Sequence, residues 1–281
     1  MLMVHFTDTW KSPDGVDLYA QGWEPETGKP KAVVCLVHGI GEHSARYAHV
    51  ADAFVKVSFV LFGFDHRGHG RSGGLRGHMP SIEAVMLDID LLIENANKRY
   101  PGLPVILYGH SLGGILVLYY GLTRKSNLKG IIATSSGLRT VIENQPLKIY
   151  AARIFGSIIP RVAISSGLDV NAISRNIQVV QDYKDDLFVH DKVTLGCGKI
   201  ILSASKWVLK HAAEMSLPLL LLHGKADAIA FATGSIEVAE QLPGKCTLVL
   251  YEGANHELHN EPAQDEVFRT MIDWMDLRLK D

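Results

Sequence analysis

Short apolar runs alternate with longer helical patterns along most of this chain. Buried strands that alternate with helices indicate a parallel sheet covered on both faces. The sequence therefore predicts an α/β fold with a mostly parallel central sheet and helices on both faces. Two stretches near the start, VHFTDTWKS and VDLYAQGWEP, alternate apolar and polar residues and predict an antiparallel hairpin at the sheet edge. The apolar runs that follow are AVVCLVHG (32–39), FVLFGFDHRGHG (59–70), LPVILYGHS (103–111), LKGIIATSS (128–136), LPLLLLHGKAD (217–227) and CTLVLYEGANH (246–256).

One interval, 138–213, interrupts this alternation. It shows no clear strand and holds an apolar helical pattern (PLKIYAARIFGSIIPRV) and a polar stretch (ISRNIQVVQDYKDD). Such a length without strands is too long for a loop in a compact domain. We therefore expect a mostly helical cap at 138–213, inserted after the sixth strand. It divides the core into a first part, 1–137, and a second part, 214–281.

The composition limits the partners and the location of the protein. A chain of 281 residues, 47% of them hydrophobic, is long enough for one large core and an insert. The formal net charge of -2 gives no electrostatic basis for binding nucleic acid. The N-terminal stretch lacks the pattern of a secretory signal, and no apolar run approaches the roughly 18 residues of a membrane span. Three widely spaced cysteines (Cys35, Cys197 and Cys246) indicate free thiols, so we expect a cytoplasmic protein.

The stretch YGHSLGG places Ser111 at a sharp turn from a strand into a helix. A nucleophile elbow needs small neighbours, because the serine adopts a strained backbone and a side chain at Gly109 or Gly113 would clash. The G-x-S-x-G pattern alone is common by chance. The buried strand before it and the apolar helix after it make the pattern specific, so we predict that Ser111 is a nucleophile.

A nucleophilic serine needs a base, and the base needs an orienting carboxylate. In this architecture the chain order is serine, then the acid, then histidine. Asp227 follows the run LPLLLL and His256 follows CTLVLY, so both lie at strand ends in the required order. His259 is a rival base, but we expect it to begin the closing helix. The other acids between the serine and the histidine lie in the insertion and follow no strand.

The reaction also needs an oxyanion hole made of N–H groups. One donor is expected from Leu112, the residue after the nucleophile, at the start of its helix. The other is expected from the loop after AVVCLVHG, where Ile40 is the best candidate. Only the backbone of these residues would act, so their apolar side chains are no objection.

Two other patterns suggest sites that the context does not support. The stretch 68–73 matches G-x-G-x-x-G, but no helix follows it to bind a pyrophosphate. The stretch HELH is one residue short of H-E-x-x-H, and no His and Asp cluster has metal-ligand spacing. Asp65, His66, Arg67 and His69 are expected to form a hydrogen-bonded loop that supports the site. We predict no cofactor and no metal.

Five motifs together resemble the monoacylglycerol lipase, or lysophospholipase-like, family of α/β-hydrolases: HGIGEHSARY, DHRGHGRSGGLRGH, YGHSLGG, HGKAD and YEGANHELHNE. The resemblance spans about 33–261 and implies the α/β-hydrolase fold, with Ser111, Asp227 and His256 as the triad. The sequence departs from the family pattern at Ala45, where family members commonly have a glycine. The cap matches least, which leaves the acyl-chain length and the head group of the substrate open.

The resemblance implies that a monoacylglycerol is cleaved to glycerol and a fatty acid through an acyl-enzyme. It also makes the apolar helical pattern of the cap a tunnel wall for the acyl chain. We expect about half of these residues to pack the cap on the core and the rest to form a tunnel mouth that also contacts a lipid surface. The residues are Ile149, Ala152, Ile154, Phe155, Ile158 and Ile159.

Other functions remain open at this stage. A broader carboxylesterase, a lysophospholipase or a thioesterase could use the same triad, because fold and triad do not fix the substrate. A non-catalytic ligand receptor with a hydrolase fold would not need all three triad residues. An epoxide hydrolase or dehalogenase is disfavoured, because these enzymes have an aspartate where Ser111 stands.

Overall fold

The central element of the protein is an eight-stranded sheet. The computed structural model describes residues 2–280, apart from the side chains at positions 148 and 151. The strand order is β1-β2-β4-β3-β5-β6-β9-β10; β2 runs antiparallel to both of its neighbours, β1 and β4, and all other neighbouring strands are parallel. The predicted sheet and its edge hairpin are therefore confirmed. The strands are β1 (Met3–Lys11), β2 (Asp17–Pro25), β3 (Ala32–Val37), β4 (Phe59–Phe64), β5 (Val105–His110), β6 (Leu128–Thr134), β9 (Leu219–Gly224) and β10 (Cys246–Tyr251).

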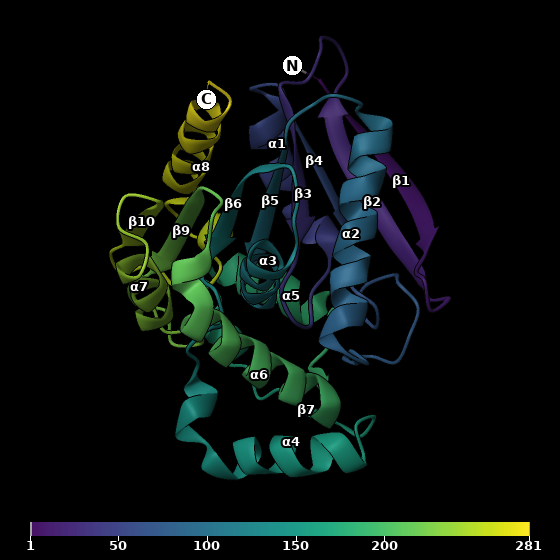
Figure 1. Ribbon diagram of the computed structural model, residues 1–281, viewed down its shortest axis with the longest axis vertical. Coiled ribbons are helices and arrows are strands. Elements are labelled where there is room, and N and C mark those ends of the chain that lie inside the picture. Colours follow the sequence, from purple (N-terminus) through teal and green to yellow (C-terminus); the bar gives the residue numbers. More distant parts are fainter. Residues whose placement is uncertain (1, 281) are drawn as a thin grey trace.

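Helices cover both faces of the sheet (Figure 1). In β5, Val105 and Leu107 point into one apolar cluster, whereas Ile106 and Tyr108 point into the other. This alternation explains why the central strands are apolar at every position. The first cluster includes residues of α2 (Ile82–Arg99), α3 (Leu112–Thr123) and α7 (Thr233–Glu240); the second includes residues of α1 (Ala48–Val55) and α8 (Gln264–Arg278).

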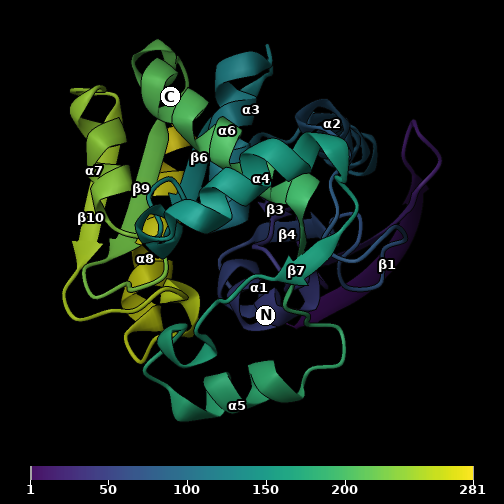
Figure 2. The ribbon, with the colours of Figure 1, turned by 90° about the horizontal axis from the view of Figure 1, so that it is seen from below.

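Between β6 and β9 the chain leaves the sheet and forms a separate group of elements. In Figure 1, α4 crosses the end of the molecule opposite the two termini, and α6 lies between α4 and the core. Figure 2 shows α4 and α5 apart, with β7 between them. The group comprises α4 (Pro146–Ile158), β7 (Ala163–Ser165), α5 (Ile177–Asp185), β8 (Lys192–Thr194) and α6 (Leu195–His211). Single 3-10 turns also occur at Val141–Asn144, Val170–Ala172 and Ala212–Glu214.

The expectation of no strand in this interval is wrong in one respect. β7 and β8 pair antiparallel over three residues each. Strands this short give no readable alternation, and all three residues of β7 are exposed. We propose that 138–213 is a cap, with α6 as its anchor, because Cys197, Ala204 and Val208 of α6 belong to the main apolar cluster.

Cysteines and helix hydropathy give two further observations. Cys35 and Cys197 are buried and Cys246 is half-buried, and all three are free thiols. Among residues 2–280, no helix combines the length and apolar character needed to cross a bilayer.

Candidate active site

Ser111 lies at the turn between β5 and α3, where its backbone is strained. Its φ is 54° and its ψ is -112°, a conformation that L residues rarely adopt. A Cβ atom at Gly109 would collide with the carbonyl of Gly113, and one at Gly113 would collide with the carbonyl of Val37. The predicted elbow is therefore present, and its glycines are required for the close approach of three backbone segments.

Ser111, His256 and Asp227 form one hydrogen-bonded chain. Nε2 of His256 lies 2.9 Å from Oγ of Ser111, and Nδ1 lies 2.7 Å from Oδ2 of Asp227. All three side chains are buried and come from the carboxyl ends of β5, β9 and β10. The structure thus brings together the three residues that the sequence singles out, in the geometry that proton transfer from serine to histidine requires.

The loop after β9 holds the carboxylate of Asp227 in its ionised form. Oδ1 accepts the N–H groups of Ile229 and Ala230, each at 2.9 Å, and Nε2 of His223 lies 3.3 Å from Oδ2. Burial alone would raise the pKa of Asp227, but the charge of His256 and the hydrogen bonds of His223 and His256 keep it well below its usual range. His223 has no role in the sequence-based prediction.

His256 is a stronger base than an isolated buried histidine. Burial lowers its pKa, but the negative charge of Asp227 and its hydrogen bond outweigh burial, so the pKa of His256 is raised. The ring of His110 lies 4.9 Å from that of His256, and burial holds the pKa of His110 at about 3. His110 therefore stays neutral and adds no positive charge beside the base.

His259, the rival base, is placed differently from our expectation. It lies in a 3-10 turn, Leu258–Asn260, whereas the closing helix α8 begins later, at Gln264. Its buried ring stacks on Tyr47 at 4.6 Å, while the hydrogen bond to Ser111 comes from His256. The prediction that His259 begins the closing helix is therefore wrong, but the preference for His256 agrees with the geometry.

Two backbone N–H groups near Ser111, those of Ile40 and Leu112, have no hydrogen-bond acceptor within residues 2–280 and could bind an oxyanion. The neighbouring N–H of Gly39, by contrast, donates to Oε1 of Glu42 at 2.6 Å. Ile40 follows β3 and Leu112 opens α3, so both lie beside Ser111 at the same edge of the sheet.

A cavity of about 420 Å³ opens at Ser111 and extends under the cap. Its wall is mainly apolar and is contributed by the core and by the insertion. Ile149 and Ala152 of α4 line it, whereas Ile154, Phe155, Ile158 and Ile159 are exposed. Other apolar lining residues are Ile115, Leu138, Val141, Val193, Leu195, Ile201, Leu202 and Leu209.

Comparison with known proteins identifies the family. The family described as serine aminopeptidase, S33 matches residues 28–263. The monoacylglycerol lipase of Mycolicibacterium smegmatis is 32% identical over 93% of both chains, and the monoglyceride lipase of Homo sapiens is 32% identical over 94% of this chain and 88% of its own. The chain belongs to the monoacylglycerol lipase family of α/β-hydrolases. It also spans 28% of an uncharacterized abhydrolase domain-containing protein of Dictyostelium discoideum, to which it is 36% identical.

Solved structures agree with this assignment. The monoacylglycerol lipase of Paleococcus ferrophilus superimposes with a TM-score of 0.83 at 32% identity, covering 99% of this chain and 100% of its own. A monoglyceride lipase variant of Saccharomyces cerevisiae, in complex with a substrate analog, has a TM-score of 0.89 at 23% identity and covers 96% of this chain and 94% of its own. The first match supports the family, and the second supports the α/β-hydrolase fold.

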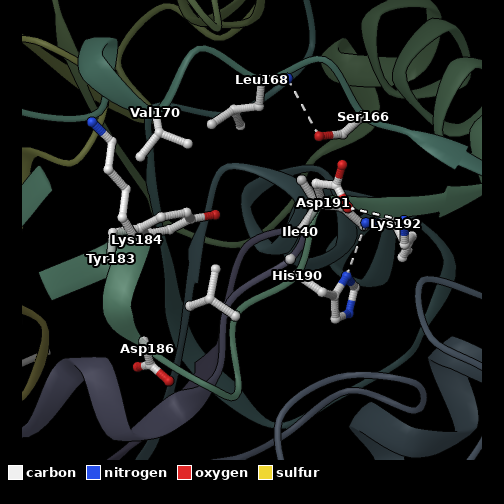
Figure 3. Close-up of a pocket in the computed structure, with 12 residues that line it drawn as sticks. Ile40, Ser166, Leu168, Val170, Tyr183, Lys184, Asp186, His190, Asp191 and Lys192 are labelled. Atoms are coloured by element: carbon white, nitrogen blue, oxygen red, sulfur yellow. Dashed lines mark hydrogen bonds and ion pairs between the residues drawn. The ribbon is translucent and has the colours of Figure 1, made fainter. Parts of the chain in front are cut away.

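In this α/β-hydrolase, a second cavity of about 300 Å³ adjoins the first at the loop after β3, which carries Ile40. Ile40, Ser166 and Leu168 line both cavities. The rest of its wall includes both apolar and charged side chains, and Figure 3 shows the hydroxyl of Tyr183 directed into it. The further polar lining residues are Lys184, Asp186, His190, Asp191 and Lys192. Ile40 therefore lies between a mainly apolar cavity and one whose wall carries several charged groups.

The loop after β4 supports the site as predicted. Asp65 accepts hydrogen bonds from the backbone N–H and the hydroxyl of Ser44, at 2.8 and 2.6 Å. The backbone N–H of His66 donates to Nε2 of His38 at 2.9 Å, and Arg67 is held by two ion pairs, one of which is fully buried. Among the described residues, no three His, Cys, Asp or Glu side chains are grouped to hold a metal ion.

A buried ion-pair network lies beside the site and has no counterpart in the sequence-based prediction. Arg46 donates to Glu42 at 2.9 Å and to both carboxylate oxygens of Glu257 at 2.7 and 2.8 Å. Glu257 directly follows His256, and Glu42 belongs to the loop that carries Ile40. The only available signal in the sequence was that these charged residues lie within two of the family motifs, HGIGEHSARY and YEGANHELHNE.

Proposed function

We propose that this protein hydrolyses monoacylglycerols to glycerol and a fatty acid through an acyl-enzyme on Ser111. The observation that carries this proposal is the chain from Ser111 to His256 to Asp227, which opens onto a mainly apolar cavity of about 420 Å³. Relatives named monoacylglycerol lipase, at 32% identity over nearly the whole chain, support the choice of substrate.

In the first half of the reaction, Nε2 of His256 takes the proton of Ser111 as Oγ attacks the ester carbonyl. The carbonyl oxygen becomes an oxyanion that accepts hydrogen bonds from the N–H groups of Ile40 and Leu112, each worth about a hundredfold in rate. Asp227 stabilises the imidazolium that forms. His256 then protonates the glycerol oxygen as its bond to the acyl carbon breaks.

In the second half, water takes the place of the alcohol. His256 removes a proton from that water, whose oxygen attacks the acyl carbon of the Ser111 ester. The same two N–H groups hold the second oxyanion. When it collapses, the proton returns to Oγ and the fatty acid leaves, which restores the starting state.

The apolar cavity predicts a preference for medium or long acyl chains. Each buried methylene contributes about 0.8 kcal/mol, so a few methylenes are enough for about a hundredfold. We expect kcat/KM for 1-lauroylglycerol to exceed that for 1-acetylglycerol by at least about a hundredfold, measured as fatty-acid release. Equal efficiency on the two esters would contradict the assignment of this cavity to the acyl chain.

The head group is tested with esters that share one acyl chain. The set is 1-lauroylglycerol, dilauroylglycerol, trilauroylglycerol, lauroyl-lysophosphatidylcholine and ethyl laurate. Preference for the monoacylglycerol supports the proposal, and the charged and hydroxyl side chains of the cavity beside Ile40 offer partners for hydroxyl groups. Comparable rates on ethyl laurate would indicate a general esterase, and preference for the lysophospholipid would indicate a lysophospholipase.

The cap also offers a surface for lipid. Leu147, Tyr150, Ile154 and Ile158 recur at three- and four-residue spacing on α4, so they share one face of the helix. Their exposed fractions are 84%, 63%, 37% and 69%, which leaves an apolar face uncovered on a helix that also lines the cavity. We infer that this face contacts the lipid surface from which the substrate enters; the cytoplasmic location stays a prediction.

A double substitution on this face is expected to weaken lipid binding. Leu147→Glu with Ile158→Glu should reduce co-sedimentation with phosphatidylcholine vesicles by at least about tenfold, because two apolar contacts are replaced by charges. Leu277→Glu is the matched control, since Leu277 is 49% exposed on α8, far from α4 in Figure 1. An equal loss in both proteins, or no loss in the double variant, would contradict the inference.

A further inference from the structure

Glu42 is a buried carboxylate that binds the backbone of the loop after β3, which carries Ile40 and is called the oxyanion loop below. It is 2% exposed, and its Oε1 accepts the N–H of Gly39 at 2.6 Å and the hydroxyl of Tyr47 at 2.8 Å. Its Oε2 accepts from Arg46 at 2.9 Å. Every oxygen of the carboxylate is therefore occupied by a donor of the protein itself, and Glu42 lines neither cavity.

Gly39 lies directly between this carboxylate and the nucleophile. A Cβ atom at Gly39 would lie 2.8 Å from Oε1 of Glu42 and 3.3 Å from Cβ of Ser111. A bond that fixes the N–H of Gly39 therefore fixes backbone that is in contact with Ser111. Ile40 follows immediately, so the position of its N–H depends on where Gly39 is held.

The other end of Gly39 is also held. Nε2 of His38 accepts the N–H of His66 at 2.9 Å, so Nδ1 of His38 carries the proton and donates to the carbonyl of Gly39 at 2.8 Å. In a trans peptide the carbonyl of Gly39 and the N–H of Ile40 point in opposite directions, and residues 2–280 contain no cis peptide. Glu42 thus holds the peptide that precedes Gly39, and His38 holds the peptide that follows it, so both peptide planes that meet at Gly39 are fixed.

Arg46 links Glu42 to the loop that carries His256, the proposed base. Its guanidinium binds Glu42 and both oxygens of Glu257, the residue after His256, and it lies 4.5 Å from the ring centre of Tyr183 in α5. Two loops that are far apart in the sequence therefore share one buried arginine. The arrangement sets the distance between the oxyanion loop and the loop that carries the base.

We propose that Glu42 is a positioning residue for the oxyanion hole: by holding the N–H of Gly39, it fixes the peptide that precedes Gly39, and together with the bond from His38 to the carbonyl of Gly39 it places the N–H of Ile40 toward the carbonyl under attack at Ser111. This proposal rests on the proposed function only in that Ser111 forms an acyl-enzyme; it does not depend on the head group. Glu42 acts through Ile40 and does not touch the substrate.

Two groups of variants test the role of the acceptor. Glu42→Leu removes the carboxylate that accepts the N–H of Gly39. Glu42→Asp keeps the negative charge near Arg46, but its shorter side chain places the oxygen too far from Gly39. Glu42→Gln keeps an oxygen in the position of the acceptor. Because a misplaced donor costs about a hundredfold, Glu42→Leu should lower kcat on p-nitrophenyl octanoate by about 10²-fold and Glu42→Asp by about tenfold, with KM within about threefold. Glu42→Gln should recover most of the loss.

The readout that separates positioning from general stability is a transition-state analogue. A trifluoromethyl ketone with an octyl chain forms an oxyanion on Ser111, so Glu42→Leu should weaken its inhibition by the same factor as kcat. Octanol, which forms no oxyanion, should bind unchanged. Asp88→Asn breaks another buried ion pair, with Arg67, and should lower the Tm while kcat and ketone affinity stay near wild type.

The outcomes decide whether Glu42 positions the oxyanion hole or only stabilises the fold. Parallel loss of kcat and ketone affinity, with rescue by Glu42→Gln, supports the positioning role. Unchanged ketone affinity in Glu42→Leu and Glu42→Asp, or equal losses in Glu42→Leu and Glu42→Gln, overturns it. If the wild type cleaves the aryl ester but no monoacylglycerol, the proposed substrate is wrong, while the same comparison still decides the role of Glu42.

Discussion

Replacing Ser111 with alanine is expected to lower kcat by about 10⁵- to 10⁶-fold on any ester that the protein cleaves. Alanine lacks the oxygen that attacks the carbonyl, so no acyl-enzyme can form. The oxyanion N–H groups of Ile40 and Leu112 remain, and they account for the residual catalysis over water. The measurement is fatty-acid release from 1-lauroylglycerol at saturating substrate.

A second serine provides the control for this experiment. Ser136 lies near the elbow, and its buried hydroxyl has no hydrogen-bond partner within residues 2–280. Ser136→Ala should keep kcat within about threefold of wild type, because it removes a hydroxyl of the same kind without touching the reacting atoms. A Ser111→Ala protein that retains more than about one hundredth of wild-type kcat would contradict the assignment of the nucleophile.

The second large effect is expected from Asp227→Asn, which should lower kcat by about 10⁴-fold. The carboxylate accepts a hydrogen bond from Nδ1–H of His256 at 2.7 Å, so Nε2 is left free to take the proton of Ser111. An asparagine would present its amide N–H to Nδ1 and favour the opposite tautomer. Asp185→Asn, at an exposed position of α5, should leave kcat unchanged.

The same substitution should also move the pH profile. The reaction needs neutral His256, so kcat/KM of the wild type should fall as the pH drops through the raised pKa of that residue. In Asp227→Asn the largest effect that raises the pKa of His256 is gone, and burial is opposed only by the weaker effects of Glu257 and Glu42, so the acid limb should shift to lower pH. An acid limb that stays in place would contradict the coupling between Asp227 and His256.

The sheet and its order of elements follow from the sequence because the strands are buried on both faces. Such strands are unbroken apolar runs, and Val105 to Tyr108 is typical: alternate residues enter opposite clusters, so none can be polar. β7 and β8 could not be predicted, because strands of three residues are too short to show a periodicity, and all three side chains of β7 are exposed. Their pairing depends on contacts within the folded cap.

The three residues of the hydrogen-bonded chain could be found for the same reason. Ser111, Asp227 and His256 each follow a buried strand at its carboxyl end, and parallel strands bring those ends to one edge of the sheet. The ion pairs that hold the surrounding loops could not be predicted from the sequence. Arg46 and Glu257 are 211 residues apart, and charged residues without periodicity usually indicate solvent exposure, whereas here both are buried against each other.

The orientation of the cap helix α4 could be predicted only in part. The apolar pattern of α4 does not reveal which face meets the cavity, because both faces carry large apolar residues. The structure turns Ile149 and Ala152 inward and leaves Ile154 and Ile158 exposed. The orientation follows from the packing of α4 on α6, a contact between two helices that the sequence pattern alone does not define.

The account depends most on an acyl-enzyme formed on Ser111 from a monoacylglycerol. Its direct test is rapid quenching of the protein with 1-lauroylglycerol in a single turnover, followed by proteolysis and mass spectrometry of the peptides. We predict that the lauroyl group appears on the peptide containing Ser111 and decays at the rate at which lauric acid is released. Release of lauric acid with no acylated Ser111, or with the acyl group on another residue, would contradict the account.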